Sequence, residues 1–212
     1  MIYLISGLGA DERVYQFLDL ANIEHQFIKW NKPERGESLA SYCLRLTNQI
    51  NQQKDVVLIG VSFGGIIAQE ISKIISVKKV IIISSVKLSS EYSWKFKLLS
   101  KSKLYRLAPI WLLNLGNELL ADYFFSVENK SEAELLHQII KDTDPVFLKW
   151  AIDKIMSWKN NDYPANLIHI HGTDDRIFPA KHIKNIIKLP KSGHLMIVNR
   201  AKEIEQFIFE HI

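Results

Sequence analysis

The chain has 212 residues, of which 47% are apolar and 24% are charged. These proportions are typical of a folded soluble domain, so they exclude a disordered chain, a collagen-like repeat and a coiled coil. The net charge of +4 is small beside 27 basic and 23 acidic residues, and it gives little support to nucleic-acid binding, which usually needs a clustered excess.

The apolar pattern predicts alternating strands and helices. In chain order we expect a strand at 2–6, a helix at 11–18, a strand at 24–30, a helix at 37–50, a strand at 55–60, a helix at 64–76, strands at 80–84, 166–170 and 186–189, and a helix at 195–211. Continuous apolar strands that alternate with helices indicate a parallel sheet covered on both faces. The single cysteine, Cys43, lies at a core position of the helix at 37–50, so we predict a core thiol rather than a nucleophile.

Residues 86–161 interrupt this rhythm. They contain no convincing strand, and a stretch of this length is too long for a structureless loop in a compact domain. Ser131 to Glu134 resembles a capping box, and Asp144-Pro145 resembles a helix start. We therefore predict a helical insertion of about four helices at 86–161, between two parts of a core domain at 1–85 and 162–212.

The strongest motif is Gly60-Val61-Ser62-Phe63-Gly64, a G-x-S-x-G between a predicted strand and a predicted helix. A tight strand-to-helix turn holds the serine in a strained backbone conformation, and side chains two positions away on either side would clash. The turn exposes the hydroxyl at the end of the strand. Ser62 is therefore a candidate nucleophile, and an idle serine in a glycine turn is the alternative.

A serine nucleophile needs a base and a group that orients the base. In this architecture both follow the serine, the acid first and the histidine second. His194 is the candidate base because it is the one histidine in a glycine turn after the last strand. The acid loop is the stretch from His171 to Pro179, which follows a late predicted strand and contains Asp174 and Asp175. Other histidines fit structural or surface positions better; they are His25, His137, His169, His171, His182 and His211.

Together these motifs resemble the α/β-hydrolase superfamily. The resemblance rests on Ser6-Gly7-Leu8-Gly9, on the serine turn, on the stretch from His171 to Pro179 and on Ser192-Gly193-His194. It implies a mostly parallel sheet of about six strands with helices on both faces, an inserted helical lid, and the absence of the first two of the usual eight strands. In that family an H-G-x-x-D-x-x-x-P stretch carries the acid at its D, which is Asp175 here, and Asp174 is the runner-up.

The resemblance implies a mechanism. His194 would take the proton of Ser62, Asp175 would orient His194, and the backbone N–H groups of Leu8 and Phe63 would form the oxyanion hole. Ser6 stands where the family commonly has histidine, which bears on substrate orientation. The implied activity is that of a carboxylesterase-like serine hydrolase acting on an ester or thioester of a small or medium acyl group, without cofactor or metal.

Two other readings stay open: an acyltransferase, and a receptor-like protein that keeps the fold and binds a ligand under the lid. The expected partner is a small acyl substrate, with no nucleic acid. Residues 87–106 carry six basic groups and one acidic group, but we favour a lid with a solvated outer face over membrane binding. The N-terminus lacks the pattern of a signal peptide, so the default expectation is a cytoplasmic protein.

Overall fold

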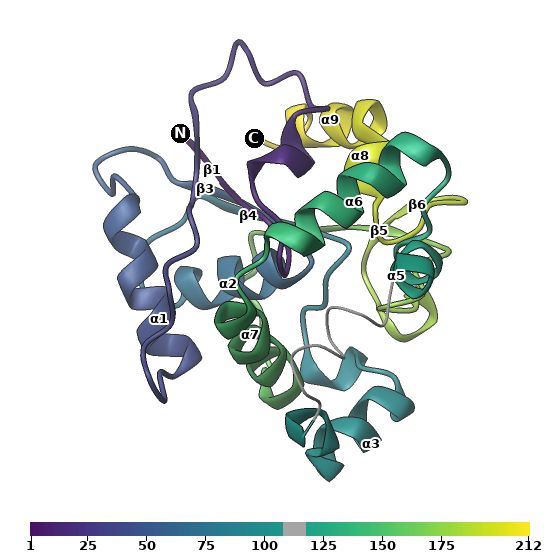
Figure 1. The fold of residues 1–212 in the computed structure, drawn as a ribbon. Coiled ribbons are helices and arrows are strands. Elements are labelled where there is room, and N and C mark those ends of the chain that lie inside the picture. The colour runs from purple at the N-terminus through teal and green to yellow at the C-terminus, as the bar shows by residue number, and fades with distance from the viewer. Residues whose placement is uncertain (108–117) are drawn as a thin grey trace.

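A computed structural model describes residues 1–107 and 118–212. Its centre is a six-stranded, all-parallel sheet in the order β2-β1-β3-β4-β5-β6 (Figure 1). The strands are β1 (Ile2–Ile5), β2 (His25–Phe27), β3 (Val57–Val61), β4 (Lys79–Ile83), β5 (Leu167–Gly172) and β6 (Ile187–Leu189). All six predicted strands are present, although β2 and β6 are only three residues long.

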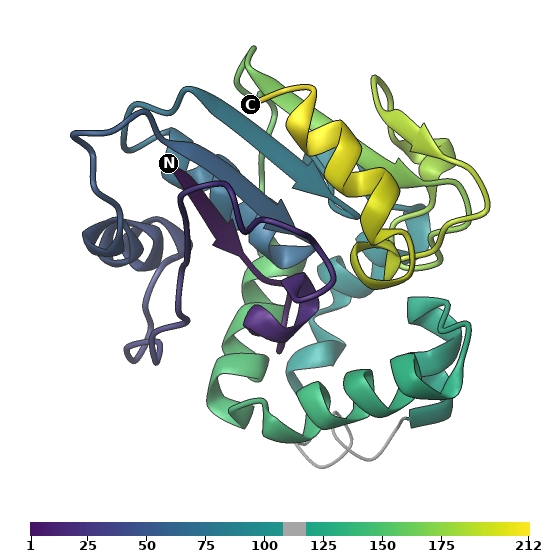
Figure 2. The ribbon, with the colours of Figure 1, turned by 90° about the horizontal axis from the view of Figure 1, so that it is seen from above.

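Alternate residues of each strand enter separate cores on the two faces of the sheet, as the pleat of a strand requires. Tyr3 and Ile5 pack in the core that contains α1 (Leu39–Leu46) and α2 (Phe63–Ser72). Ile2 and Leu4 pack in the core that contains α8 (Met196–Asn199) and α9 (Ala201–Phe209). Figure 2 shows α9 on one face of the sheet and α2 on the other, which confirms the predicted layers.

Between β4 and β5 the described residues form helices only. They are η3 (Ser89–Glu91), α3 (Trp94–Ser102), η4 (Leu104–Leu107), α5 (Glu118–Phe125), α6 (Lys130–Asp142) and α7 (Pro145–Ser157). Asp144 caps α7 as predicted, accepting a hydrogen bond from the N–H of Phe147. The cap of α6 is Asn129, two residues before the predicted Ser131. The helical insertion lies beyond the ends of β1 and β3 (Figure 2).

Several predicted helices are shorter or broken, including those at 37–50 and 64–76, which form α1 (Leu39–Leu46) and α2 (Phe63–Ser72). Residues 11–18 form a single 3-10 turn, η1 (Glu12–Tyr15), capped by Asp11. The predicted helix at 195–211 is interrupted at Arg200, whose backbone leaves the helical region and whose side chain pairs with Glu128 of the insertion. Cys43 is fully buried, and burial raises the pKa of its thiol, as expected of a core residue.

The prediction of a solvated outer face for the basic segment at 87–106 is correct for only part of that segment. Lys87 is only 2% exposed and pairs with Glu91, which is 6% exposed. The remaining basic side chains, from Lys95 to Arg106, are exposed. No described helix is long and apolar enough to cross a membrane.

Candidate active site

Ser62 lies at the turn from β3 into α2, with φ 54° and ψ −116°. A side chain at Gly60 would place its Cβ 2.2 Å from the carbonyl oxygen of Gly64, and one at Gly64 would lie 2.1 Å from that of Ile5. Both positions therefore require glycine. The left-handed backbone of a serine is costly, and strain of this kind is often found at functional sites.

The structure brings Ser62, His194 and Asp175 together from three separate loops. His194 Nε2 is 3.0 Å from Ser62 Oγ, and His194 Nδ1 is 2.8 Å from Asp175 Oδ2. The loops follow β3, β6 and β5, and the carboxyl ends of parallel strands meet at one edge of the sheet. This is the geometry of a nucleophile, a base and an orienting carboxylate. The catalytic roles stay predictions.

Asp175 is 3% exposed and its carboxylate is fully engaged. Oδ1 accepts hydrogen bonds from the N–H groups of Ile177 and Phe178, each at 2.8 Å, and Oδ2 faces His194. Burial by itself would raise the pKa of Asp175, but His194, His171 and the N–H of Phe178 together outweigh it and lower that pKa. Asp174, the runner-up, is exposed and contacts Thr173, so its carboxylate is not the one beside His194.

The predicted oxyanion residues flank Ser62. Phe63 is the first residue of α2, where backbone N–H groups have no partner inside the helix. Leu8 lines the same cavity as Ser62, and a Cβ added at the preceding Gly7 would lie 3.3 Å from Ser62 Cβ. The two backbone groups thus border the serine, and their role toward an oxyanion stays a prediction.

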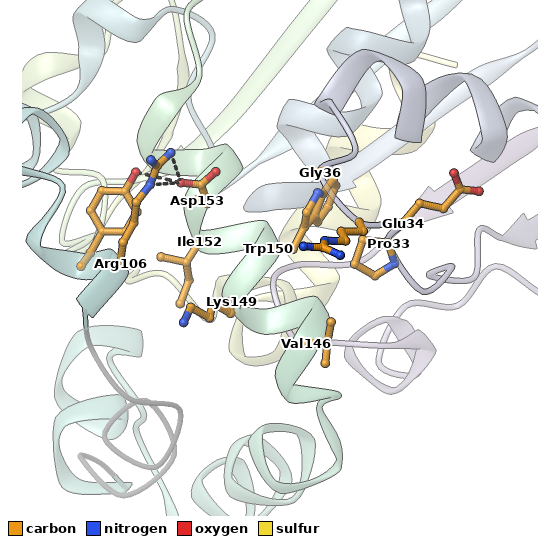
Figure 3. A pocket seen from close by; sticks show the side chains of 11 residues that line it. Pro33, Glu34, Gly36, Arg106, Val146, Lys149, Trp150, Ile152 and Asp153 are labelled. Atoms are coloured by element: carbon orange, nitrogen blue, oxygen red, sulfur yellow. Dashed lines mark hydrogen bonds and ion pairs between the residues drawn. The ribbon is translucent and has the colours of Figure 1, made fainter.

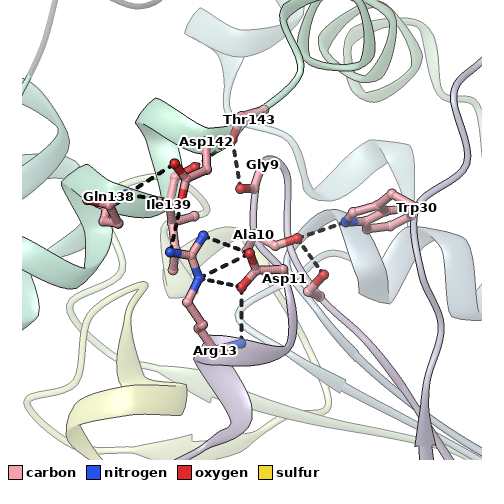
Figure 4. A network of polar contacts seen from close by, with 10 residues as sticks. Gly9, Ala10, Asp11, Arg13, Trp30, Gln138, Ile139, Asp142 and Thr143 are labelled. Carbon is pink, nitrogen blue, oxygen red and sulfur yellow. Dashed lines mark hydrogen bonds and ion pairs between the residues drawn. The ribbon is translucent and has the colours of Figure 1, made fainter.

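A polar network fixes the loop that carries Leu8 (Figure 4). Ser6 Oγ donates to the carbonyl of Ala10 at 2.7 Å, and Trp30 Nε1 donates to the same oxygen at 2.9 Å. Ser6 therefore closes the loop on itself. From the insertion, Thr143 Oγ1 donates to the Gly9 carbonyl at 2.8 Å. The loop is consequently held by both the sheet and the helical insertion.

A charged contact lies beside that hydrogen bond. The guanidinium of Arg13 pairs with Asp11 at 2.7 Å and with Asp142 of α6 at 2.9 Å. Because Asp142 precedes Thr143, the end of α6 contacts the loop after β1 at two adjacent residues (Figure 4). The helical insertion and the predicted oxyanion loop are therefore joined directly.

A cavity of about 250 Å³ opens onto Ser62 and His194. Its walls come from the loop after β1, from α6 and α7 of the insertion, and from the segments around Phe178 and Leu195. Among the described residues that line it, His194 is the one ionisable side chain. The site thus combines a polar reacting end with an apolar chamber, as is usual for small-molecule pockets.

A larger hollow of about 830 Å³ lies elsewhere, between α7, η4 and the loop at 33–36 (Figure 3). Its lining includes Arg106 and Asp153, which pair at 2.7 Å. None of Ser62, Asp175 and His194 lines it. The smaller cavity is therefore the candidate active site, because Ser62 and His194 border it.

The sequence predicts structural positions for His169 and His171, and both are buried in β5. It does not predict that they contact the loop of Asp175. His171 Nε2 lies 3.5 Å from Asp175 Oδ2, and His169 links His171 to the buried Lys87. The spacing of His171 and Asp175 in the sequence is the one signal that could have suggested the first contact.

Comparison with known proteins agrees with this fold. The profile of the Alpha/beta hydrolase family matches residues 5–207. No curated protein gives a significant match.

Solved structures with a similar fold include a hydrolase from Pseudomonas aeruginosa (TM-score 0.73, 14% identity, covering 99% of this chain and 88% of that one). An esterase from Thermogutta terrifontis has a TM-score of 0.70 at 16% identity, with coverage of 99% and 88%. An esterase from Exiguobacterium antarcticum has a TM-score of 0.68 at 16% identity, with coverage of 99% and 90%. At this identity the likeness shows the fold, including the inserted helical segment.

Proposed function

The chain belongs to the alpha/beta hydrolase family, and on that premise we propose that it is a serine hydrolase that cleaves a carboxylic ester or thioester of a small or medium acyl group. One observation carries the proposal: the hydroxyl of the strained Ser62 lies 3.0 Å from His194 Nε2, and Asp175 lies 2.8 Å from the other imidazole nitrogen. A serine hydroxyl becomes a useful nucleophile in such an arrangement.

The acylation step follows from this geometry. Ser62 Oγ attacks the acyl carbonyl while His194 Nε2 takes its proton, and Asp175 stabilises the imidazolium that forms. The negative charge that develops on the carbonyl oxygen is accepted by the N–H groups of Leu8 and Phe63. When the tetrahedral intermediate collapses, the imidazolium gives its proton to the leaving alcohol or thiol, and the acyl group stays on Ser62.

Deacylation repeats the same proton transfers with water. His194 removes a proton from the water as it attacks the acyl-enzyme, and it returns that proton to Ser62 Oγ when the carboxylic acid leaves. Each turnover therefore consumes one water and restores the starting protonation state. The chain's own side chains and backbone groups suffice for every step.

The apolar cavity supports the choice of acyl group. A group the size of a water molecule occupies about 30 Å³, so a cavity of about 250 Å³ has room for roughly eight such groups. That number corresponds to an acyl chain of short or medium length. A charged acyl tail would lose its hydration there without gaining a partner. The structural relatives named as esterases support the same class of reaction.

A panel of p-nitrophenyl esters from acetate to palmitate tests the proposal. We expect wild-type protein to hydrolyse the short and medium esters best, and Ser62→Ala to reduce turnover to background. Ser72→Ala is the matched control, because Ser72 lies at the other end of α2 and hydrogen-bonds the Gln69 carbonyl. Equal rates for wild type and Ser62→Ala would contradict the proposal.

A further inference from the structure

Next to Asp175 lies a cluster of buried polar side chains that the proposed reaction does not use. Lys87 and Glu91 follow β4, whereas His169 and His171 belong to β5. The four residues are 2%, 6%, 2% and 0% exposed. A buried ion pair adds little stability by itself, because desolvation offsets the attraction between its charges. A role in the fold's stability alone therefore explains this cluster poorly.

A continuous series of contacts connects Lys87 to the loop that carries Asp175. Lys87 Nζ lies 3.4 Å from Glu91 Oε1, donates to the Lys184 carbonyl at 2.6 Å and lies 3.2 Å from His169 Nδ1. His169 Nε2 lies 3.1 Å from His171 Nδ1. His171 Nε2 lies 2.8 Å from the carbonyl oxygen of Phe178.

These contacts fix where the protons lie. An ammonium group can only donate, so His169 Nδ1 must accept and its proton sits on Nε2. That N–H donates to His171 Nδ1, which leaves the proton of His171 on Nε2, where it donates to the Phe178 carbonyl. Every donor then has an acceptor, and the pattern is complete only when both imidazoles are neutral.

The neutrality of His171 matters because two imidazoles approach the same carboxylate oxygen. Asp175 Oδ2 lies 2.8 Å from His194 Nδ1 and 3.5 Å from His171 Nε2. A cationic His171 would share the charge of Asp175 and would repel the imidazolium that forms on His194 during the reaction. A neutral His171 leaves that charge to His194.

We propose that Lys87 is a positioning residue, which through His169 holds His171 neutral with its proton on Nε2, so that the charge of Asp175 stabilises His194 alone. The catalytic part of this inference rests on the proposed function. Burial lowers the pKa of both His169 and His171, which supports the neutral state. The titratable groups that contact or border the two imidazoles are Lys87, Glu91, Asp175 and His194, and the Tyr163 ring lies 5.5 Å from Lys87 Nζ.

Nitrogen NMR of the imidazoles tests the proton pattern without any activity assay. Spectra of ¹⁵N-labelled protein are assigned with His169→Gln and His171→Gln. We expect both rings to stay neutral, with the proton on Nε2, from about pH 8 down to about pH 5.5, well below the usual histidine midpoint. A ring protonated on Nδ1, or one that becomes cationic above about pH 6, would overturn the proposal.

The variant Lys87→Met/Glu91→Gln removes both charges of the pair, so neither is left buried alone. Thermal unfolding and circular dichroism confirm that it folds. Its kcat/KM should be within about twofold of wild type near pH 9 and at least about tenfold lower near pH 6, because the two histidines can now take up a proton. Lys130→Met/Glu134→Gln, at an exposed pair with the same spacing on α6, is the matched control and should leave the pH profile unchanged.

A defect of the same size at every pH, or an unchanged profile, would contradict the positioning role. The proposed function and the positioning role of Lys87 can fail independently of each other. If wild-type protein hydrolyses no ester, the proposed function fails, whereas the same NMR spectra recorded on wild type and on Lys87→Met/Glu91→Gln still decide whether Lys87 sets the protonation of His169 and His171.

Discussion

The core domain and the helical insertion contribute different things to the site. Ser62, Asp175 and His194 all come from loops that follow strands of the sheet, and they are polar, paired and mostly buried. The walls contributed by α6 and α7 are apolar and carry no ionisable group. Substitutions in the core should therefore change the rate with every substrate, whereas substitutions in the insertion should change which substrate is preferred.

The largest effect is expected at Ser62 and His194. Either residue replaced by alanine should lower kcat by about 10³-fold or more for short and long esters alike, because the nucleophile and its base act as one unit. The double variant should be little worse than either single one. Steady-state kinetics on two esters of different length checks this, and a loss confined to one ester would break the division between core and insertion.

Asp175→Asn should lower kcat by about 10²- to 10⁴-fold, because an amide in place of the carboxylate favours the wrong tautomer of His194 and does not stabilise its cation. Asp174→Asn is the matched control. Its carboxylate is exposed and contacts Thr173, so its kcat should stay close to wild type. If the two variants lost activity equally, the assignment of the acid would be wrong.

The pH dependence of stability should reflect the buried histidines of the core. The folded-state pKa of His169 and His171 lies below the ordinary value of 6.5, so the unfolded chain binds protons that the folded one does not. The free energy of unfolding should thus fall as the pH drops below about 6.5, by at most about 1.4 kcal/mol per pH unit for each histidine. Urea unfolding at several pH values measures this, and His169→Gln should flatten the dependence.

In the insertion, Ile140→Phe should shorten the preferred acyl chain. Ile140 is half-buried and lines the cavity, so a larger side chain fills space without disturbing the sheet. We expect kcat/KM to fall about tenfold for the longest accepted ester and little for acetate. Ile140→Leu keeps the volume and serves as control, and a uniform loss for all chain lengths would speak against the separation of roles.

The smallest effect concerns the contact between the two regions. Thr143→Val removes the hydrogen bond to the Gly9 carbonyl while keeping the shape of the side chain. It should cost about 1 kcal/mol of stability and reduce kcat a few-fold, because the loop carrying Leu8 becomes less fixed. Thermal melts and kinetics check both effects, and an unchanged kcat would show that the loop holds its position without the insertion.

The sheet and the three candidate catalytic side chains could be predicted from the sequence because their signals are local. Within the serine turn itself, Gly60 is required because a Cβ there would meet the backbone of Gly64, whereas Gly64 is required because of the Ile5 carbonyl of the neighbouring strand β1. His194 and Asp175 are recognisable by the strands that precede them. The predicted cap of α6 was displaced because Asn129 Oδ1 accepts the N–H of Glu132, while the Ser131 hydroxyl donates to the same Asn129 oxygen.

What the sequence could not predict depends on contacts between distant segments. Lys87 meets His169 across 82 positions, and in the sequence it belongs to a run of basic residues that are otherwise exposed. Its burial comes with contacts to His169 and to the Lys184 carbonyl, which are far away in the sequence, rather than from any local pattern. The volume of the cavity is likewise set by the packing of α6 and α7 over the sheet.

The central claim is that Ser62 is an activated nucleophile in a cavity for acyl groups. A fluorophosphonate probe followed by intact-protein and peptide mass spectrometry tests it most directly. The account predicts one probe per chain, attached to Ser62, slowed in Asp175→Asn and lost in Ser62→Ala. An unlabelled wild-type protein, or a label on another residue, would contradict it.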